Sequence, residues 1–407
     1  LPQLPQLLVK RRNESGEIVT VKLDTLPEKL DALREKFFPK PKDADLTDIE
    51  TGLHPEPINI DEEIQEKEIR DAIQHVTSDK APGPDQIPNR VLKKAEEWLI
   101  PHFHKLFNAT IRIGYHPKAW KAAITLALRK PNKEDYTLIG SYRPIALLNI
   151  MGKLLELVMA RKLSELAESN GTLPETQMGA RKGRSTETAL QLLTEQVHTI
   201  WNLPGKQRVA TMLCMDISGA FDNVSHTRLL DNLRKRRTPE FIVRWVTSFL
   251  QERTTTIKVT EGESELLYTE TGIPQGSPIS PILFLFFIAD LLDIINNAAL
   301  RTSAIGFVDD THILTYGEST ERNCRTLERI HEQCDEWARK HGAQFAPEKY
   351  ELIHFARQPK QFNMAATLQI GQIRKVATDN VRVLGVQIDT KLKWGPYLAK
   401  VVQKHTA

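Results

Sequence analysis

The stretch "SAIGFVDDTHILTY", residues 303–316, places two adjacent aspartates, Asp309 and Asp310, between two apolar runs. The apolar runs favour strands, whereas aspartate is depleted in strands, so the sequence predicts a hairpin with the two acids in its turn. Neighbouring carboxylates repel each other. Two interpretations follow: an ordinary polar turn, or a site where the doubled charge holds a cation.

A second carboxylate site lies in "VATMLCMDISGAFDN", residues 209–223, where an apolar strand runs directly into Asp216. A charge at the end of a buried strand is costly unless something compensates it. If this strand and the hairpin are neighbours in one sheet, three carboxylates converge. Such oxygen ligands suit Mg²⁺, and two ions about 4 Å apart can activate a 3′-hydroxyl and stabilise departing pyrophosphate. An aspartate before Ser-Gly is also an ordinary cap, and that alternative stays open.

The segment between these sites, "TGIPQGSPISPILFLFF" (271–287), combines a proline- and glycine-rich loop with an apolar run that predicts a buried helix. The amide of Gln275 can donate and accept hydrogen bonds, and Gly276 leaves room for a ligand near the backbone. A simple helix-entry loop, with Ser280 as cap and Pro281 in the first turn, is the alternative. It does not explain the Pro-Gln-Gly-Ser-Pro run.

The composition is ordinary for a globular protein: of 407 residues, 40% are apolar and 26% are charged. Residues 110–190 contain 13 Lys and Arg against 7 Asp and Glu. That excess suits a polyanionic partner, although uneven solvation is the other interpretation.

Three cysteines without a CxxC pair predict neither a disulfide framework nor a zinc site. The most apolar stretch, 278–292, is too short to cross a membrane, and no signal peptide opens the chain.

Periodicity predicts helices and strands without a regular βαβ rhythm, so an α+β fold is favoured over a doubly wound sheet. Helices are expected near 26–40, 62–76, 88–113, 151–169, 186–201, 226–235, 238–251 and 320–341. Strands are expected near 16–23, 209–215, 350–355 and 381–388, with a hairpin over 254–271. The segment 78–88 is expected to be an irregular loop.

Three motifs, "MDISGAFD", "GIPQGSPISP" and "GFVDD", resemble in order and spacing the central motifs of a reverse transcriptase palm. The segments "SDKAPGPDQIPNRVLKKA", "YRPIALLN", "MGARKGRSTETAL", "APEKYELIHF" and "VRVLGVQID" narrow the resemblance to non-LTR (LINE-type) retrotransposons, of the jockey-like or fungal-type group. The resemblance covers roughly residues 61–395.

The resemblance implies a right-hand polymerase fold with fingers and palm, an antiparallel palm sheet covered by helices, and a thumb that is mostly missing. Residues 1–76 would be an N-terminal extension and linker, and 77–389 the reverse transcriptase domain, with the core of the family from about 111. Fingers would span about 77–205 and palm about 206–389. Residues 390–407 would be the truncated start of a thumb.

Carried across position by position, the resemblance implies roles around the aspartates. Asp216 and Asp309 would bind metal, the Ile217 carbonyl would complete the shell, and Asp310 would support the site as the second acid of the pair. Lys349 matches the lysine that acts as general acid to the departing pyrophosphate.

Other positions match substrate and template contacts of the family. Phe221 matches the steric gate under the nucleotide sugar, where a bulky ring excludes a 2′-hydroxyl. Gln275 and Gly276 would line the incoming nucleotide. Further contacts are implied for basic residues, with solvated surface as the alternative: Arg143 and Lys153 on the triphosphate, and Arg181, Arg184 and Ser185 on template and primer.

The resemblance implies an RNA-directed DNA polymerase that extends a 3′-hydroxyl primer with dNTPs on an RNA template by two-metal-ion transfer. Its cofactors would be two Mg²⁺ ions, or Mn²⁺. Its partners would be the RNA template, a DNA primer and dNTPs, with no membrane. Endonuclease and cysteine-rich domains are expected in the full-length polyprotein, and retrotransposition implies the cytoplasm and nucleus. A catalytically silent RNA-binding remnant is the alternative; an RNA-templated RNA polymerase is disfavoured by Phe221.

Overall fold

The computed structural model describes residues 3–12, 17–40, 44–49, 52–131, 133–206 and 208–406. The chain forms two compact units, each assembled from segments that are separated in sequence. The first unit consists of Leu1–Asp43, Thr47–Leu166 and Phe221–Phe284, and the second of Ala44–Leu46, Ala167–Ala220 and Leu285–Ala407. Within the described ranges, no helix combines the length and the apolar character that a membrane crossing needs.

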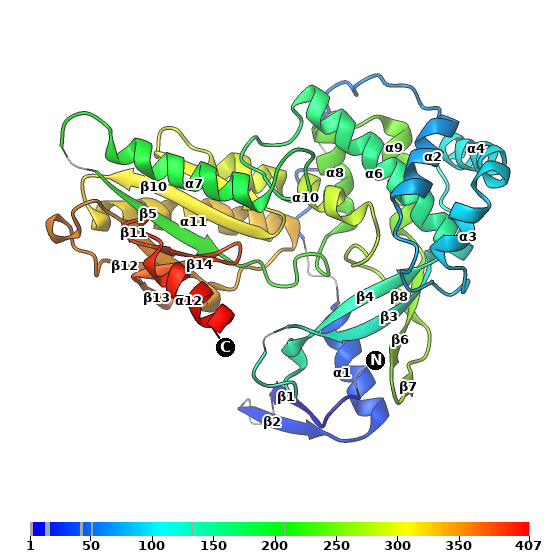
Figure 1. The fold of residues 1–407 in the computed structure, drawn as a ribbon, viewed down its shortest axis with the longest axis horizontal. Coiled ribbons are helices and arrows are strands. Elements are labelled where there is room, and N and C mark those ends of the chain that lie inside the picture. The colour runs from blue at the N-terminus through cyan, green and yellow to red at the C-terminus, as the bar shows by residue number, and fades with distance from the viewer. Residues whose placement is uncertain are drawn as a thin grey trace. The chain divides into compact units, whose positions relative to one another are not determined.

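The second unit is built on a four-stranded antiparallel sheet in the order β11-β5-β10-β9 (Figure 1). All seven residues of β5 are buried, because α7 packs on one face of the sheet and α11 on the other. This double burial explains why β5 has an unbroken apolar sequence. The elements are β5 (Val209–Met215), β9 (Thr302–Phe307), β10 (Asp310–Gly317), β11 (Glu351–Phe355), α7 (Thr186–Trp201) and α11 (Thr320–His341).

Alternate residues of β5 belong to different cores. Met212 faces Leu193 and Val197 of α7, whereas Thr211 faces α11, where Asn323 Nδ2 donates to its Oγ1 over 2.9 Å. The first core also includes the hairpin of β14 (Asn380–Val383) and β15 (Val386–Asp389). A second hairpin, β12 (Thr367–Ile370) and β13 (Ile373–Val376), packs against α11, and α12 (Gly395–Thr406) ends the unit.

The first unit contains a mixed sheet in the order β4-β3-β6-β7, in which β8 also pairs with β6. Its strands are β3 (Ala122–Arg129), β4 (Tyr142–Leu148), β6 (Arg253–Val259), β7 (Gly262–Glu263) and β8 (Leu267–Thr269). Its helices are α2 (Glu66–His75), α3 (Asn89–Lys94), α4 (Glu96–Ile113), α5 (Lys118–Lys121), α8 (His226–Lys235) and α9 (Glu240–Leu250). Helices α6 (Ile150–Asn170) and α10 (Ser280–Ile295) each run from one unit into the other.

The N-terminal segment belongs to the core of the first unit. The hairpin of β1 (Leu7–Arg12) and β2 (Ile18–Leu23) and the helix α1 (Leu26–Phe37) bury apolar side chains against the mixed sheet. Leu7, Leu33 and Phe37 pack in one cluster with sheet residues such as Ile257. The described part of residues 1–43 is therefore packed as an integral layer of this unit.

The α+β prediction is confirmed, as are the helices at 186–201, 226–235 and 320–341 and the loop at 78–88. The helix predicted over 88–113 is wrong in one respect: Ala95, with φ −105° and ψ 15°, separates α3 from α4. Strands β3 and β4 were not predicted. Pro144 in β4 weakens a strand pattern, but β4 is an edge strand of the sheet, where a missing N–H is tolerated.

Candidate active site

The register of the second unit's sheet brings the predicted acids to one end of two neighbouring strands. β10 pairs antiparallel with β5 so that Thr311 lies opposite Met215. Asp216 is the residue after β5 and Asp310 is the first residue of β10, so both lie at the same end of the two strands. Asp309 belongs to the two-residue turn between β9 and β10. The condition set out from the sequence, that the strand ending at Asp216 and the hairpin are neighbours in one sheet, is therefore met.

Backbone hydrogen bonds fix Asp216 after its strand ends. The Ala346 N–H donates to the Asp216 carbonyl over 3.0 Å, and the Ser218 N–H donates to the Gln344 carbonyl over 2.8 Å. Between them, buried Ile217 forms an isolated antiparallel bridge with Phe345. The chain therefore stays extended for two residues beyond β5, which places the Asp216 side chain at the end of the sheet.

Lys349 reaches the same place from the segment before β11. Its Nζ lies 2.9 Å from Asp216 Oδ1, and both side chains are substantially exposed, at 56% and 42%. An exposed ion pair of this kind contributes little to stability. The ion pair places an ammonium group directly beside a predicted metal-binding carboxylate.

Asp309 and Asp310 bind protons more tightly than ordinary aspartates do. Partial removal from water raises the pKa of Asp310 to about 6, and the charges of Asp309 and Asp216 add to this effect. The pKa of Asp309 is raised by the same desolvation and by Asp216. Nearby cations would reverse both shifts. Across the residues that the structure describes, no three His, Cys, Asp or Glu side chains are grouped tightly enough to hold a metal ion.

Phe221, the predicted gate, lies in the first unit and is half-buried. One face of its ring stacks on Phe284, with centroids 4.9 Å apart and planes 10° from parallel. The Ile273 N–H donates to the Phe221 carbonyl over 2.9 Å. Gly272 has φ +80°, and a Cβ there would lie 2.7 Å from the Asp222 carbonyl oxygen. The loop at 271–277 is therefore packed directly on the segment that carries Phe221.

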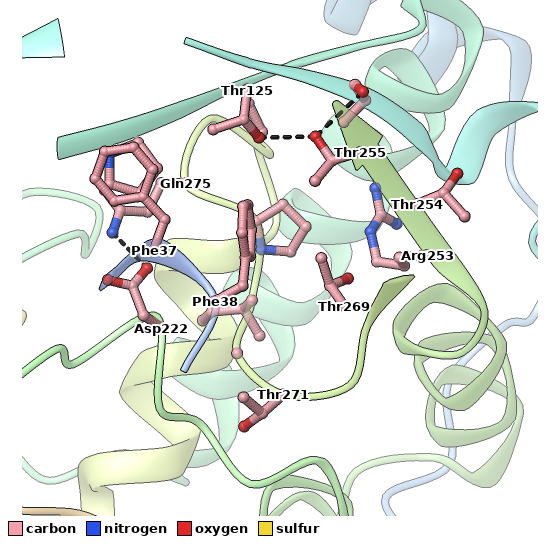
Figure 2. A pocket seen from close by; sticks show the side chains of 16 residues that line it. Phe37, Phe38, Thr125, Asp222, Arg253, Thr254, Thr255, Thr269, Thr271 and Gln275 are labelled. Atoms are coloured by element: carbon pink, nitrogen blue, oxygen red, sulfur yellow. Dashed lines mark hydrogen bonds between the residues drawn. The ribbon is translucent and has the colours of Figure 1, made fainter. Parts of the chain in front are cut away.

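Gln275 points into a small cavity of the first unit, where its Nε2 donates to Asp222 Oδ1 over 2.8 Å (Figure 2). Phe37 and Phe38 line the same cavity, together with threonines of the mixed sheet. The cavity measures about 50 Å³, which leaves room for only a few water molecules. The prediction that Gln275 lines an incoming nucleotide stays untested, and the partner that the structure shows for its amide is Asp222.

Gly276 has φ +121°, a conformation that favours glycine. Glycine is also needed here because residue 276 lies very close to the backbone of β4. A Cβ at this position would lie 2.5 Å from the Ala146 carbonyl oxygen. The Ala146 N–H also donates to the Gln275 carbonyl over 2.6 Å. Packing against β4 thus explains why glycine is needed at position 276, which the sequence did not suggest. Contact of Gly276 with a nucleotide stays a prediction.

The predicted basic contacts differ in their surroundings. Arg143 is exposed on the edge strand β4. Lys153 of α6 is half-buried, and burial lowers its pKa although Glu156 and Asp85 oppose the shift. The carboxyl group of Glu156 is fully buried and accepts a hydrogen bond from Ser277. Sequence reasoning missed this bond, which ties the PQGS run to α6.

The predicted template contacts have internal partners. The Arg181 side chain is 1% exposed and pairs with Glu168, with Nε 2.7 Å from Oε1. It is therefore not available to a template, and the prediction for Arg181 is wrong. Arg184 pairs with Glu175 over 2.8 Å, and Ser185 caps α7 by accepting from the Thr188 N–H. Template contact by these two residues stays a prediction.

Comparisons with known proteins agree with this architecture. The profile of the family described as reverse transcriptase (RNA-dependent DNA polymerase) matches residues 128–388. The chain is 27% identical over 345 residues to the probable RNA-directed DNA polymerase from transposon BS of Drosophila melanogaster, covering 84% of this chain and 37% of that protein. It is also 27% identical to the RNA-directed DNA polymerase from the mobile element jockey of the same species, covering 83% and 36%.

Among solved structures, an apo telomerase from Candida tropicalis matches 68% of this chain and 54% of its own, at 14% identity and a TM-score of 0.47. The chain spans little more than a third of the length of the two Drosophila relatives. The family profile covers well over half of the chain, and the relatives are polymerases of non-LTR elements. The chain therefore belongs to the reverse transcriptase (RNA-dependent DNA polymerase) family and is similar to the non-LTR, LINE-type members.

Proposed function

We propose that this chain is the RNA-directed DNA polymerase of a non-LTR retrotransposon, extending a 3′-hydroxyl primer with dNTPs on an RNA template. The observation that carries the proposal is the pairing of Thr311 with Met215, which brings Asp216, Asp309 and Asp310 to the same end of β5 and β10. Such an element would act in the cytoplasm and nucleus. Fingers at about 77–205 and a palm at about 206–389 remain part of the proposal.

The chemistry of the donor set suits a divalent cation, because the charge of Asp216 raises the pKa of both Asp309 and Asp310, and carboxylate oxygens are the ligands that Mg²⁺ prefers. Asp216, Asp309 and Asp310, with the Ile217 carbonyl, would hold two Mg²⁺ ions, or Mn²⁺. When bound, such ions lower the pKa of the primer hydroxyl and neutralise charge on the triphosphate.

The chain's own residues would supply the remaining functions. Lys349 Nζ, which lies at Asp216 in this structure, would donate a proton to the departing pyrophosphate. Arg143 and Lys153 would bind the triphosphate oxygens. The ring of Phe221, held by its stack on Phe284, would stand under the sugar and reject a 2′-hydroxyl.

Incorporation of dTTP on poly(rA)/oligo(dT) with Mg²⁺ tests this function. The chain should extend the primer, and Asp309→Asn should reduce the rate at least about 100-fold, because metal ions contribute several kcal/mol to transition-state stabilisation. RNA binding should survive the substitution. Salt-dependent RNA binding without dTTP incorporation by the unsubstituted chain would contradict the proposal and favour an RNA-binding remnant.

A further inference from the structure

The hairpin turn that carries Asp309 has an unfavourable backbone conformation. The loop between β9 and β10 contains only Val308 and Asp309. Two-residue hairpin loops need a positive φ at the first position, where glycine or asparagine is preferred. Here that position is Val308, with φ +59°. A β-branched residue in this region is strained, so neighbouring structure must hold it in place.

A buried glutamine from another segment binds both polar backbone groups of Val308. Gln177 is fully buried. Its Oε1 accepts from the Val308 N–H over 3.2 Å, and its Nε2 donates to the Val308 carbonyl over 3.4 Å. The same Oε1 accepts from the Gly179 N–H over 3.3 Å. One carboxamide thus joins the strained turn to the segment before α7.

The backbones on either side of this carboxamide are also paired. The Gly306 N–H donates to the Thr176 carbonyl over 3.0 Å, and the Met178 N–H donates to the Gly306 carbonyl over 2.8 Å. Gly179 then lies against the turn so closely that a Cβ would be 2.5 Å from Val308 N and 2.7 Å from Val308 Cγ2. Residues 176–179 therefore form a support that fits this one turn conformation.

We propose that Gln177 and Gly179 are positioning residues for Asp309. By holding Val308 at its positive φ, they fix the direction in which the next residue presents its carboxylate. The effect of these two residues on catalysis rests on the proposed function. Their effect on the conformation of the turn does not depend on it. The competing explanation is that Gln177 is a satisfied buried amide with a purely structural role.

Gln177→Met tests the carboxamide, because methionine has a similar length but neither donates nor accepts the two bonds. We expect kcat for dTTP incorporation to fall about 10- to 100-fold, as for catalytic groups displaced by about 1 Å. The Mg²⁺ concentration for half-maximal rate should rise, since a displaced Asp309 binds the ion less well. Gln196→Met, a half-buried glutamine near Ser303 of β9, is the matched control and should change neither quantity.

Hydrogen exchange provides a readout that does not depend on activity. The amides of residues 306–309 should exchange faster in Gln177→Met than in the unsubstituted chain, and not in Gln196→Met. Unchanged exchange and unchanged kcat in a folded Gln177→Met would overturn the proposal. An inactive unsubstituted chain would instead overturn the proposed function, while the exchange comparison would still decide whether Gln177 supports the turn.

Gly179→Ala tests the same support if Gln177→Met does not fold. The φ of Gly179 is open to other residues, so the added Cβ acts by pressing on Val308 and on the Phe307 carbonyl carbon before it. We expect faster exchange at residues 306–309 and a lower kcat. Gly140→Ala is the control, because a Cβ there has no heavy atom within 4 Å. Equal behaviour of the two alanine variants would contradict the proposed support.

Discussion

The carboxyl group of Asp222 allows the electrostatics of the loop at 271–277 to be tested quantitatively. Burial raises its pKa from the ordinary value of 3.8 to about 6, although the hydrogen bond from Gln275 and the charges of Lys36 and Lys130 oppose the shift. The folded chain therefore binds this proton more tightly than the unfolded chain. The associated stability is complete below about pH 4 and is lost as the pH rises through about 6.

The magnitude follows from the difference between the two pKa values, which is about 2 units. At 1.36 kcal/mol per unit, ionised Asp222 lowers the free energy of unfolding by about 3 kcal/mol above pH 7. Asp222→Asn removes the charge and keeps an oxygen that can accept from Gln275 Nε2. We expect this variant to be more stable than the unsubstituted chain by up to about 3 kcal/mol near pH 8, and equally stable near pH 4.

Urea unfolding of both chains at several pH values measures this difference directly. Asp31→Asn, at an exposed aspartate of α1, is measured in the same series as the control for the loss of one carboxyl group. A stability difference for Asp222→Asn that is the same at about pH 4 and about pH 8 would contradict the raised pKa of Asp222. A variant that is less stable at the higher pH would refute it as well.

Three further substitutions test other parts of the molecule. Lys349→Gln removes the ammonium group beside Asp216 and should lower kcat for incorporation about 100-fold, with RNA binding unchanged; an unchanged kcat would exclude Lys349 as the proton donor. Phe221→Ala should gain incorporation of rNTPs, measured as the ratio of dNTP to rNTP rates, and an unaltered ratio would exclude the gate. Glu156→Ala leaves the buried Arg253 charge without its opposing carboxylate and should lower the free energy of unfolding by about 3–5 kcal/mol in urea; a loss below about 1 kcal/mol would contradict this.

The elements with strong periodicity could be predicted from sequence alone. The helix at 320–341 and the strand at 209–215 follow from a 3.6-residue pattern and from an unbroken apolar run. The pairing of that strand with the hairpin at 303–316 could be stated only as a condition, because strand order depends on long-range contacts. The register that pairs Thr311 with Met215, and so brings Asp216 and Asp310 to one end of the sheet, is visible only in the folded chain.

Side-chain partners were the least predictable part of the site. Arg181 in a basic segment suggested a surface cation, yet Glu168 of α6 pairs with it in the interior. Nothing in the sequence indicated a role for Gln177, because that role depends on the positive φ of Val308, more than a hundred residues away in the chain. Gly276 was predicted to need space, but the structure shows that the space is for the Ala146 backbone.

The most direct test of the account is single-nucleotide incorporation on an RNA template, measured during a Mg²⁺ titration for the unsubstituted chain and for Asp216→Asn. The rate should rise and saturate with Mg²⁺ in the unsubstituted chain and should be at least about 100-fold lower in the variant. Binding to the RNA–primer duplex should be equal in both. Incorporation by Asp216→Asn at the rate of the unsubstituted chain would contradict the central claim that these carboxylates form the polymerase site.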